Sequence, residues 1–392
     1  MAAGTLVLAG LVALPIVGAA NPATQVASRH PTHQTPAALD TPSTDAPDSG
    51  GPVTTDVPTT TTGVEHTTTS APVTTTDSVD DPSQTDLLDD GPPITPDPKI
   101  VQYALARKNS YPQHIVAGPD GALWFTESNT NAIGRITTTG DIKEFQLAAP
   151  FQTPVDIVVG PDSALWFNDA NGTSVGRITT DGRVTAYPTG WESYSPMVVG
   201  PDGALWFSTS ASVANPSTAS HLIRLTPAGN VTAFAVGDYA IHDLVVGADG
   251  NIWGTETAGG LWRITPAGVA TRFLADRGFT VSSGIAKGPD GRLWFGYGLP
   301  GGSQELGYLT PTGDFGHVAL PANVGVWQMV FSPNGDLWFT TEDTKIVRMT
   351  PGGDFTTYDV ERPCGITIGP DGNIWFTNDL GHSIGRIGIA DA

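Results

Sequence analysis

The stretch GPDGALWFTES at residues 118–128 is the first of seven similar copies, and these copies decide the fold. The later copies are GPDSALWFNDA (160–170), GPDGALWFSTS (200–210), GADGNIWGTET (247–257), GPDGRLWFGYG (288–298), SPNGDLWFTTE (332–342) and GPDGNIWFTND (369–379). Each copy contains one tryptophan, and successive tryptophans lie 37 to 47 residues apart. This is the length of a four-stranded propeller blade. The sequence therefore predicts an all-β protein, a seven-bladed β-propeller over residues 99–392.

Each copy lies within a unit that reads as four short strands. In the first unit the predicted strands are residues 112–118, 122–127, 132–136 and 141–147. Proline and glycine in the turn at 118–121 stand where a β-turn favours them. The short strands, glycine-rich turns and regular aromatic residues exclude a helical solenoid.

The two ends of the repeat complete one another. The seventh unit stops after its third strand, residues 383–387, and lacks a fourth. Residues 99–105, KIVQYAL, have the pattern of DIKEFQL, the fourth strand of the first unit. We expect residues 99–105 to pair with residues 383–387 and close the ring, which removes the exposed sheet edges.

Two residue types recur at fixed places in the unit. The tryptophan of the second strand is predicted to pack between neighbouring blades, because such aromatic side chains dominate core burial. An arginine in the third strand is predicted to pair between blades. The arginines are Arg135, Arg177, Arg224, Arg263, Arg348 and Arg386, and Tyr308 replaces them in the fifth unit.

The N-terminal quarter of the chain has a different composition. Residues 1–20 are apolar and end in small residues, which predicts a signal peptide or, alternatively, an uncleaved anchor. Residues 21–98 are rich in Thr, Pro and Asp and contain few large apolar groups, so we expect a disordered linker or stalk. These features predict a secreted or cell-envelope protein.

Charge and cysteine content narrow the possible partners. The formal net charge of −21 argues against nucleic acid, whose phosphates require clustered Lys and Arg. Cys364 is the only cysteine, so no intrachain disulfide can form, and it reads as a small buried apolar residue. We expect a monomer that binds a small molecule or peptide, with the cell wall as a further candidate partner.

Starts of first strands and ends of second strands open on one face, where functional loops are expected. His242 and Glu256 are equidistant from Asp249 in one hairpin, so their side chains are predicted to meet at the channel mouth. A carboxylate beside an imidazole suits a general base or a metal site, and equally a pair that satisfies itself. Tyr297 and Trp327, on the next two units, would supply an aromatic wall.

Other ionisable residues have weaker patterns. Glu127 and Asp169 occupy equivalent places on adjacent units and could share a hard cation through their oxygens. Four further histidines have no carboxylate partner in the pattern, and we interpret them as structural or surface residues. They are His114, His221, His317 and His382.

The unit P-x-x-I-x-x-G-P-D-G-x-L-W-F-T-E-x-x-x-N-x-I-G-R-I, at residues 112–136 and in part at 363–387, resembles the streptogramin B lyases, also called virginiamycin B lyases. The resemblance covers all seven units. It implies linearisation of a cyclic depsipeptide by elimination, with a histidine base and a magnesium ion held by two glutamates. In the family pattern the base begins a first strand, with one metal-binding glutamate two residues before it and the other at the end of the second strand.

The resemblance transfers to this sequence residue by residue. His242 matches the base and Glu256 matches one metal-binding glutamate. Ala240 stands at the other glutamate, and Ser195 stands where the preceding blade supplies a substrate-contacting histidine. The family site lies nearer the C-terminus, and the residues in those places here are Trp327, Thr341, Cys364 and Asn378.

The leading hypothesis is a secreted, magnesium-dependent lyase acting on a cyclic depsipeptide or related small molecule. His242 would be catalytic, Tyr297, Trp327 and Ser195 would bind substrate, and Glu256, Glu127 and Asp169 would be metal ligands. One alternative is a non-catalytic cell-envelope binding module. Another is a calcium-dependent lactonase that uses Glu127, Asp169 and Asn378.

Overall fold

The computed structural model describes the repeat region almost completely. The described residues are 60–62, 65–66, 100–193, 196–209, 220–237, 241–256, 259–278, 280–299, 303–322, 324–341 and 343–389. The predicted leader, residues 1–20, and most of the predicted linker, residues 21–98, lie outside them.

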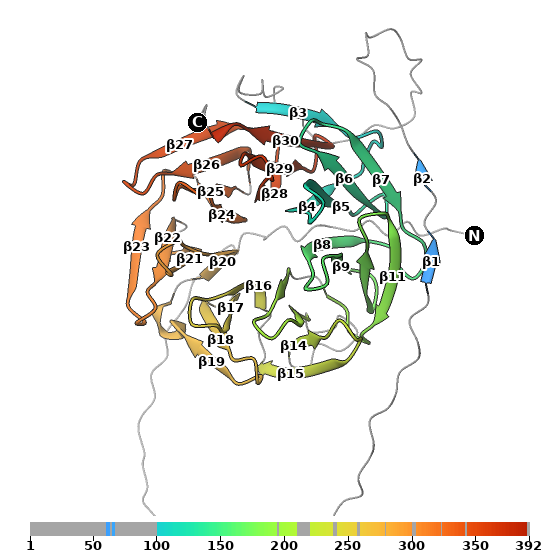
Figure 1. Cartoon of the computed structure of the whole chain (residues 1–392). Helices are drawn as coiled ribbons and strands as arrows, with labels where there is room; N and C mark the ends of the chain where they lie inside the picture. Colours follow the sequence, from blue (N-terminus) through green and yellow to red (C-terminus); the bar gives the residue numbers. More distant parts are fainter. Residues whose placement is uncertain are drawn as a thin grey trace, which may run out of the picture. The chain divides into compact units, whose positions relative to one another are not determined.

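Seven antiparallel sheets follow one another along the repeat, and each is called a blade (Figure 1). Blade 1 contains β4 (Pro112–Ala117), β5 (Ala122–Glu127), β6 (Ala132–Thr137) and β7 (Ile142–Gln146). Blade 2 contains β8 (Pro154–Val159), β9 (Leu165–Asp169), β10 (Ser174–Ile178) and β11 (Arg183–Pro188). Blade 3 contains β12 (Met197–Val199), β13 (Leu205–Ser208), β14 (Ser220–Leu225) and β15 (Val231–Gly237).

The remaining blades repeat this order. Blade 4 contains β16 (Ile241–Val246), β17 (Ile252–Glu256), β18 (Gly260–Ile264) and β19 (Ala270–Phe273). Blade 5 contains β20 (Thr280–Lys287), β21 (Leu293–Gly298), β22 (Gln304–Leu309) and β23 (Phe315–Ala319). Blade 6 contains β24 (Met329–Phe331), β25 (Leu337–Thr340), β26 (Lys345–Met349) and β27 (Phe355–Asp359). Blade 7 contains β28 (Pro363–Ile368), β29 (Ile374–Asn378), β30 (Ser383–Ile387) and β3 (Ile100–Ala104).

The first strands of the blades form a closed inner ring (Figure 1). Each first strand contacts the first strand of the next blade, and β28 of blade 7 contacts β4 of blade 1. The outer edge of blade 7 is β3, which pairs antiparallel with β30 so that Tyr103 lies opposite Ile384. The predicted closure by the N-terminal strand is therefore confirmed.

The repeated tryptophans pack between blades, as predicted. Trp124 of blade 1 forms a buried cluster with Ile157 and Leu165 of blade 2, and the same arrangement recurs at every blade boundary. In six blades an aromatic residue of the fourth strand stacks against this tryptophan, as Tyr103 does with Trp375 at a ring separation of 5.5 Å. The core thus consists of seven hydrophobic clusters, one at each boundary between blades and each containing one of the repeated tryptophans.

The predicted pairing of the arginines between blades is wrong. Arg135 donates to Asp120, which lies in the first turn of its own blade, at 2.7 Å. Trp124 donates to the other oxygen of the same carboxylate at 3.0 Å. The arginine is one side of an Asp, Trp and Arg triad that fixes the turn of a single blade, and its ion pair with the turn aspartate is found in five blades. In blade 6 Asn334 occupies that turn position, and Arg348 pairs instead with Asp336.

Two short strands come from the Thr-rich segment. β1 (Thr60–Thr62) pairs with β11 and β2 (Glu65–His66) pairs with β7, each as a fifth strand. Composition did not predict these strands, although β-branched threonine favours extended pairing. Nothing in the described ranges forms a helix with the length and apolar character needed to cross a bilayer.

We expect Tyr103→Ala to weaken ring closure, because it removes the ring that covers Trp375. The substitution should lower the free energy of unfolding by about 2 kcal/mol, because the half-buried Tyr103 ring packs on Trp375. Urea denaturation followed by tryptophan fluorescence measures this change. Val101→Ala, on the same strand but exposed, is the control and should change stability by less than about 0.5 kcal/mol. Equal effects of both substitutions would contradict a closure that depends on aromatic packing.

Candidate functional site

Hydroxyl groups at the ends of the second strands hold the inner ring in place. The Thr126 hydroxyl accepts from the main chain of His114 at 3.2 Å and donates to the Val155 carbonyl of blade 2 at 3.0 Å. Thr377 links blade 7 to blade 1 in the same way, by donating to the Gln113 carbonyl. The starts of the first strands, which surround the channel mouth, are therefore fixed from the neighbouring blade.

The predicted meeting of His242 with Glu256 across the hairpin is wrong in register. Ile241 is the register partner of Glu256, and a β-bulge follows between Ile241 and Leu244. The extra residue places His242 inside the bulge. His242 is half-buried, and burial lowers the pKa of its imidazole.

Glu256 is engaged by two other side chains of blade 4. It is fully buried, and Arg272 on β19 binds both of its oxygens, at 2.7 and 2.9 Å. The Trp262 indole donates a third hydrogen bond at 2.7 Å. Its charge is balanced inside the blade, which leaves it a structural ion pair.

Glu127 in blade 1 occupies the same place, but the residue equivalent to Arg272 is Glu144. Glu127 is fully buried, accepts from Thr130 at 2.9 Å, and has one oxygen without a hydrogen-bond partner. Burial and the nearby Glu144 carboxylate raise the pKa of Glu127 to about 8. Arg107 binds Glu144 at 3.0 Å.

Asp169 in blade 2 caps local turns and does not join Glu127. One oxygen accepts from the main chain of Gln152 and Thr153, and the other accepts from Asn171. The predicted cation between Glu127 and Asp169 therefore has no shared geometry to support it.

The residues predicted to hold magnesium do not fit that ion. Glu256 is neutralised by an arginine, and Glu127 and Asp169 are each engaged within their own blades. Across the described ranges, no three His, Cys, Asp or Glu side chains gather in a way that could hold a metal ion. Ala240 and Ser195 lie outside the described residues.

Tyr297 lies toward the outer strands of blade 5, away from the predicted aromatic wall. Its hydroxyl donates to Glu305 on β22, and His317 on β23 contacts the same carboxylate at 2.7 Å. With Arg277 and Phe315 these residues line a cavity of about 330 Å³. His317 was expected to lack a carboxylate partner, so that interpretation is corrected.

Trp327 comes two residues before β24, at the end of blade 6 where the sequence predicts the channel mouth. The residue is 38% exposed and is one of the few large apolar residues at the surface of the described ranges. It hydrogen-bonds to the sulfur of Cys364, which begins the first strand of blade 7. Burial and the Asp379 carboxylate raise the pKa of the Cys364 thiol to about 12, so the thiol is neutral.

The blade 7 side of the mouth carries an ion pair and a second exposed apolar residue. Arg362, two residues before Cys364, lies 3.4 Å from the Asp379 carboxylate. Asp379 is buried and keeps one oxygen without a partner. Leu380 follows it and is exposed, while the Asn378 side chain caps the same loop by accepting from Gly381.

His114 also has a carboxylate partner, contrary to expectation. Its Nδ1 lies 2.5 Å from Asp156 of blade 2, and the amide nitrogen of Gln328 lies 2.8 Å from its Nε2. His114, Asp156 and Gln328 each lie one residue after the strand-start position used in the sequence analysis. Comparing that next position in all seven blades would have identified this polar cluster from the sequence.

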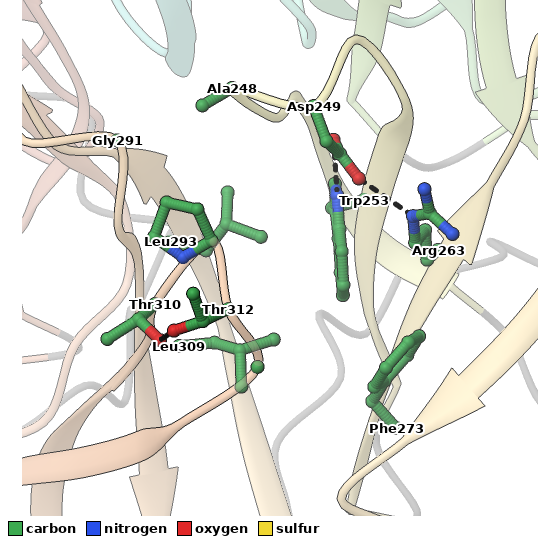
Figure 2. A pocket seen from close by; sticks show the side chains of 12 residues that line it. Ala248, Asp249, Trp253, Arg263, Phe273, Gly291, Leu293, Leu309, Thr310 and Thr312 are labelled. Carbon is green, nitrogen blue, oxygen red and sulfur yellow. Dashed lines mark hydrogen bonds and ion pairs between the residues drawn. The ribbon is translucent and has the colours of Figure 1, made fainter.

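A further groove lies at the opposite end of blades 4 and 5 (Figure 2). It is lined on one side by Asp249, Trp253 and Arg263, and on the other by the turn containing Thr310 and Thr312. Its volume is about 300 Å³. These residues belong to the first turn and the last turn of their blades, so the groove does not overlap the mouth.

Two parts of the chain match a known protein family. A sequence model of the virginiamycin B lyase family matches residues 90–215 and 300–392. The matched ranges contain Trp327, Cys364 and Asn378 but omit His242 and Glu256.

Solved structures of similar proteins match about three quarters of the chain. A streptogramin B lyase structure is 26% identical, with a TM-score of 0.65 over 73% of this chain and 96% of that chain. A catalytically inactive histidine-to-alanine variant of virginiamycin B lyase from Staphylococcus aureus, with quinupristin, is 25% identical, with a TM-score of 0.65 over 74% and 99%. Hydrazine synthase from Kuenenia stuttgartiensis, at 14% identity and a TM-score of 0.60 over 73% and 98%, shares the fold alone.

We expect Arg272→Ala to destabilise the protein strongly, because it leaves the buried Glu256 carboxylate without its positively charged partner. Removing one partner of a buried pair should cost about 3 kcal/mol of unfolding free energy. Arg263→Ala removes a more exposed ion pair and is the control, with an expected loss of about 1 kcal/mol or less. Chemical denaturation of both variants tests this. A loss for Arg272→Ala no larger than the control would show that Glu256 is free for another partner.

Proposed function

Because the chain belongs to the virginiamycin B lyase family, we propose that it is a ligand-binding propeller, which takes a peptide or cyclic depsipeptide at its channel mouth without opening it by elimination. The proposed contact surface comprises the exposed Trp327 and Leu380 and the Arg362 and Asp379 ion pair. An aromatic platform beside a few polar groups suits such a ligand. The predicted leader and linker favour binding outside the cytoplasm, at the cell envelope.

One observation carries this proposal: Cys364 stands where the family pattern has its base. A thiol whose pKa is raised to about 12 remains protonated at neutral pH and does not remove a proton from carbon. Elimination needs that proton to be taken from the position next to the ester carbonyl. The site therefore keeps the place of the base without its chemistry.

The neighbouring replacements point the same way. Arg362 occupies the place of the first metal-binding glutamate, and its positive charge repels a cation. Asn378 occupies the place of the second and uses its oxygen to cap a loop. Trp327 replaces the substrate-contacting histidine and retains the capacity to bind.

A lyase centred on blade 4 is the second candidate. It is favoured by His242, whose pKa is lowered by burial, so that the imidazole is neutral and able to accept a proton. Against it stand the Arg272 pairing of Glu256 and the family match, which omits this blade. Product analysis separates the two candidates.

We expect the full chain to bind quinupristin saturably, with the same affinity in EDTA and in magnesium, and to leave it cyclic. Trp327→Ala should weaken binding at least about tenfold, because exposed aromatic anchors contribute most to such sites. Isothermal titration calorimetry measures affinity, with Val269→Ala as the matched control, because Val269 is an exposed apolar residue in the last turn of blade 4, away from Trp327.

Chromatography of the incubated ligand tests for chemistry. Elimination is an isomerisation, so a linear product would change retention while its mass stayed constant, whereas hydrolysis would add one water. A linear product that disappears in His242→Ala would establish the blade 4 lyase and overturn the binding proposal. Failure of quinupristin to bind, or equal binding by Trp327→Ala, would overturn the proposed mouth site.

A further inference from the structure

Four polar side chains meet across the channel one step below the mouth. His114 on β4 contacts Asp156 on β8 and the Gln328 side chain, which precedes β24. Gln328 belongs to blade 6 and His114 to blade 1, so this contact passes over blade 7. Gly365 of blade 7 makes room for it, since a Cβ there would lie 2.3 Å from the Gln113 carbonyl oxygen and 3.0 Å from the His114 Cα.

The fourth member, Asp243, comes from blade 4. Its carboxylate interacts electrostatically with both His114 and Asp156, although these residues belong to blades 1 and 2. Electrostatic coupling between side chains of such distant blades places the groups around the central channel. Asp243 is largely buried, with part of its side chain still accessible.

Both carboxylates also bind the next blade. Asp156 accepts from the main chain of Met197 in blade 3 at 2.5 Å. Asp243 accepts from the main chain of Ile285 in blade 5 at 3.0 Å, and from its neighbour Leu244 at 2.8 Å. The charged groups of this cluster therefore take part in contacts between four pairs of blades. The pairs are blades 1 and 2, blades 2 and 3, blades 4 and 5, and blades 6 and 1.

The cluster carries more acidic than basic groups. The charged groups that face one another are His114 from β4, Asp156 from β8 and Asp243 from β16. Two carboxylates and one imidazole in a low-dielectric interior leave a net negative charge unless a further proton is bound. The hydrogen bonds that Asp243 accepts from Ile285 and Leu244 come from neutral main-chain groups.

We propose that the channel of this propeller is a proton-binding site, in which His114 and Asp243, gathered around the Asp156 carboxylate, hold protons that these two residues release when the chain unfolds. Proton loss leaves the two carboxylates repelling each other across the channel. This repulsion between buried carboxylates lowers the stability of the folded ring. The proposal concerns the ring itself and does not depend on which ligand the mouth takes.

The raised pKa values of Asp243 and His114 change the stability in the same direction as pH rises. Burial, with a smaller contribution from Asp156, raises the pKa of Asp243 from 3.8 to about 7. Burial lowers the pKa of His114, but Asp156 and Asp243 outweigh it and raise the pKa above 6.5. In each case the folded protein holds a proton over a range where the unfolded chain has lost it, so stability declines as pH rises from about 4 to about 7 and above.

The test compares unfolding of the full chain and of Asp243→Asn across pH 4 to 9. The amide cannot titrate, so the variant should lose less stability than the parent between pH 5 and pH 8, whatever constant penalty the substitution adds. Asp354→Asn, an exposed carboxylate in the last turn of blade 6, is the matched control and should keep the parent's pH profile. The comparison is between slopes because Glu127 also titrates in this range.

A second measurement follows His114 itself in the parent protein and does not require Asp243→Asn to fold. Nitrogen-detected NMR of the histidine rings, with the His114 signal assigned by its loss in His114→Gln, reports its titration directly. The midpoint should lie above 6.5 and fall in Asp156→Asn, which removes the carboxylate at Nδ1. A His114 midpoint at or below 6.5 would overturn the proposal, as would an Asp243→Asn profile parallel to that of the parent.

Discussion

Pairing of β3 with β30 is the constraint on which the rest of the molecule depends. Each blade buries its tryptophan only because another blade lies against it, and blade 7 has a complete sheet only because β3 supplies its outer strand. With the ring closed, the first strands are held at fixed distances around one axis. Side chains from blades far apart in sequence, such as Gln328 and His114, can then meet in the channel.

The repeat is informative enough to predict the blades, their strands and their closure, because all three follow from a period and from turn chemistry that recur seven times. The site was less accessible to the same reasoning. Equal distances of His242 and Glu256 from the turn predict a cross-strand pair only if the ladder is regular, and a bulge shifts it by one residue. The partner of Glu256 is Arg272, two strands away, a contact that spacing within one hairpin cannot show.

The contrast between blades shows how one scaffold position acquires different properties. The end of the second strand is Glu256 in blade 4 and Glu127 in blade 1, and both side chains are fully buried. In blade 4 the fourth strand supplies Arg272, and a bidentate ion pair results. In blade 1 it supplies Glu144, and the carboxyl pKa rises to about 8. The mouth follows the same logic, since Cys364, Arg362 and Asn378 occupy positions whose main chain is preserved while their chemistry differs from the family pattern.

Blade 7 is built from strands at both ends of the repeat region, and this has a consequence for biosynthesis. Its outer strand, β3, leaves the ribosome about 280 residues before β30, the strand with which it pairs. Translation of six blades thus precedes any possibility of sealing the ring, and the early strand must wait without its partner. Pairing over such a separation also slows folding, because the chain between the partners has to be ordered first. A nascent chain of this protein is therefore exposed to proteases and to pairing with foreign strands until synthesis of blade 7 is finished.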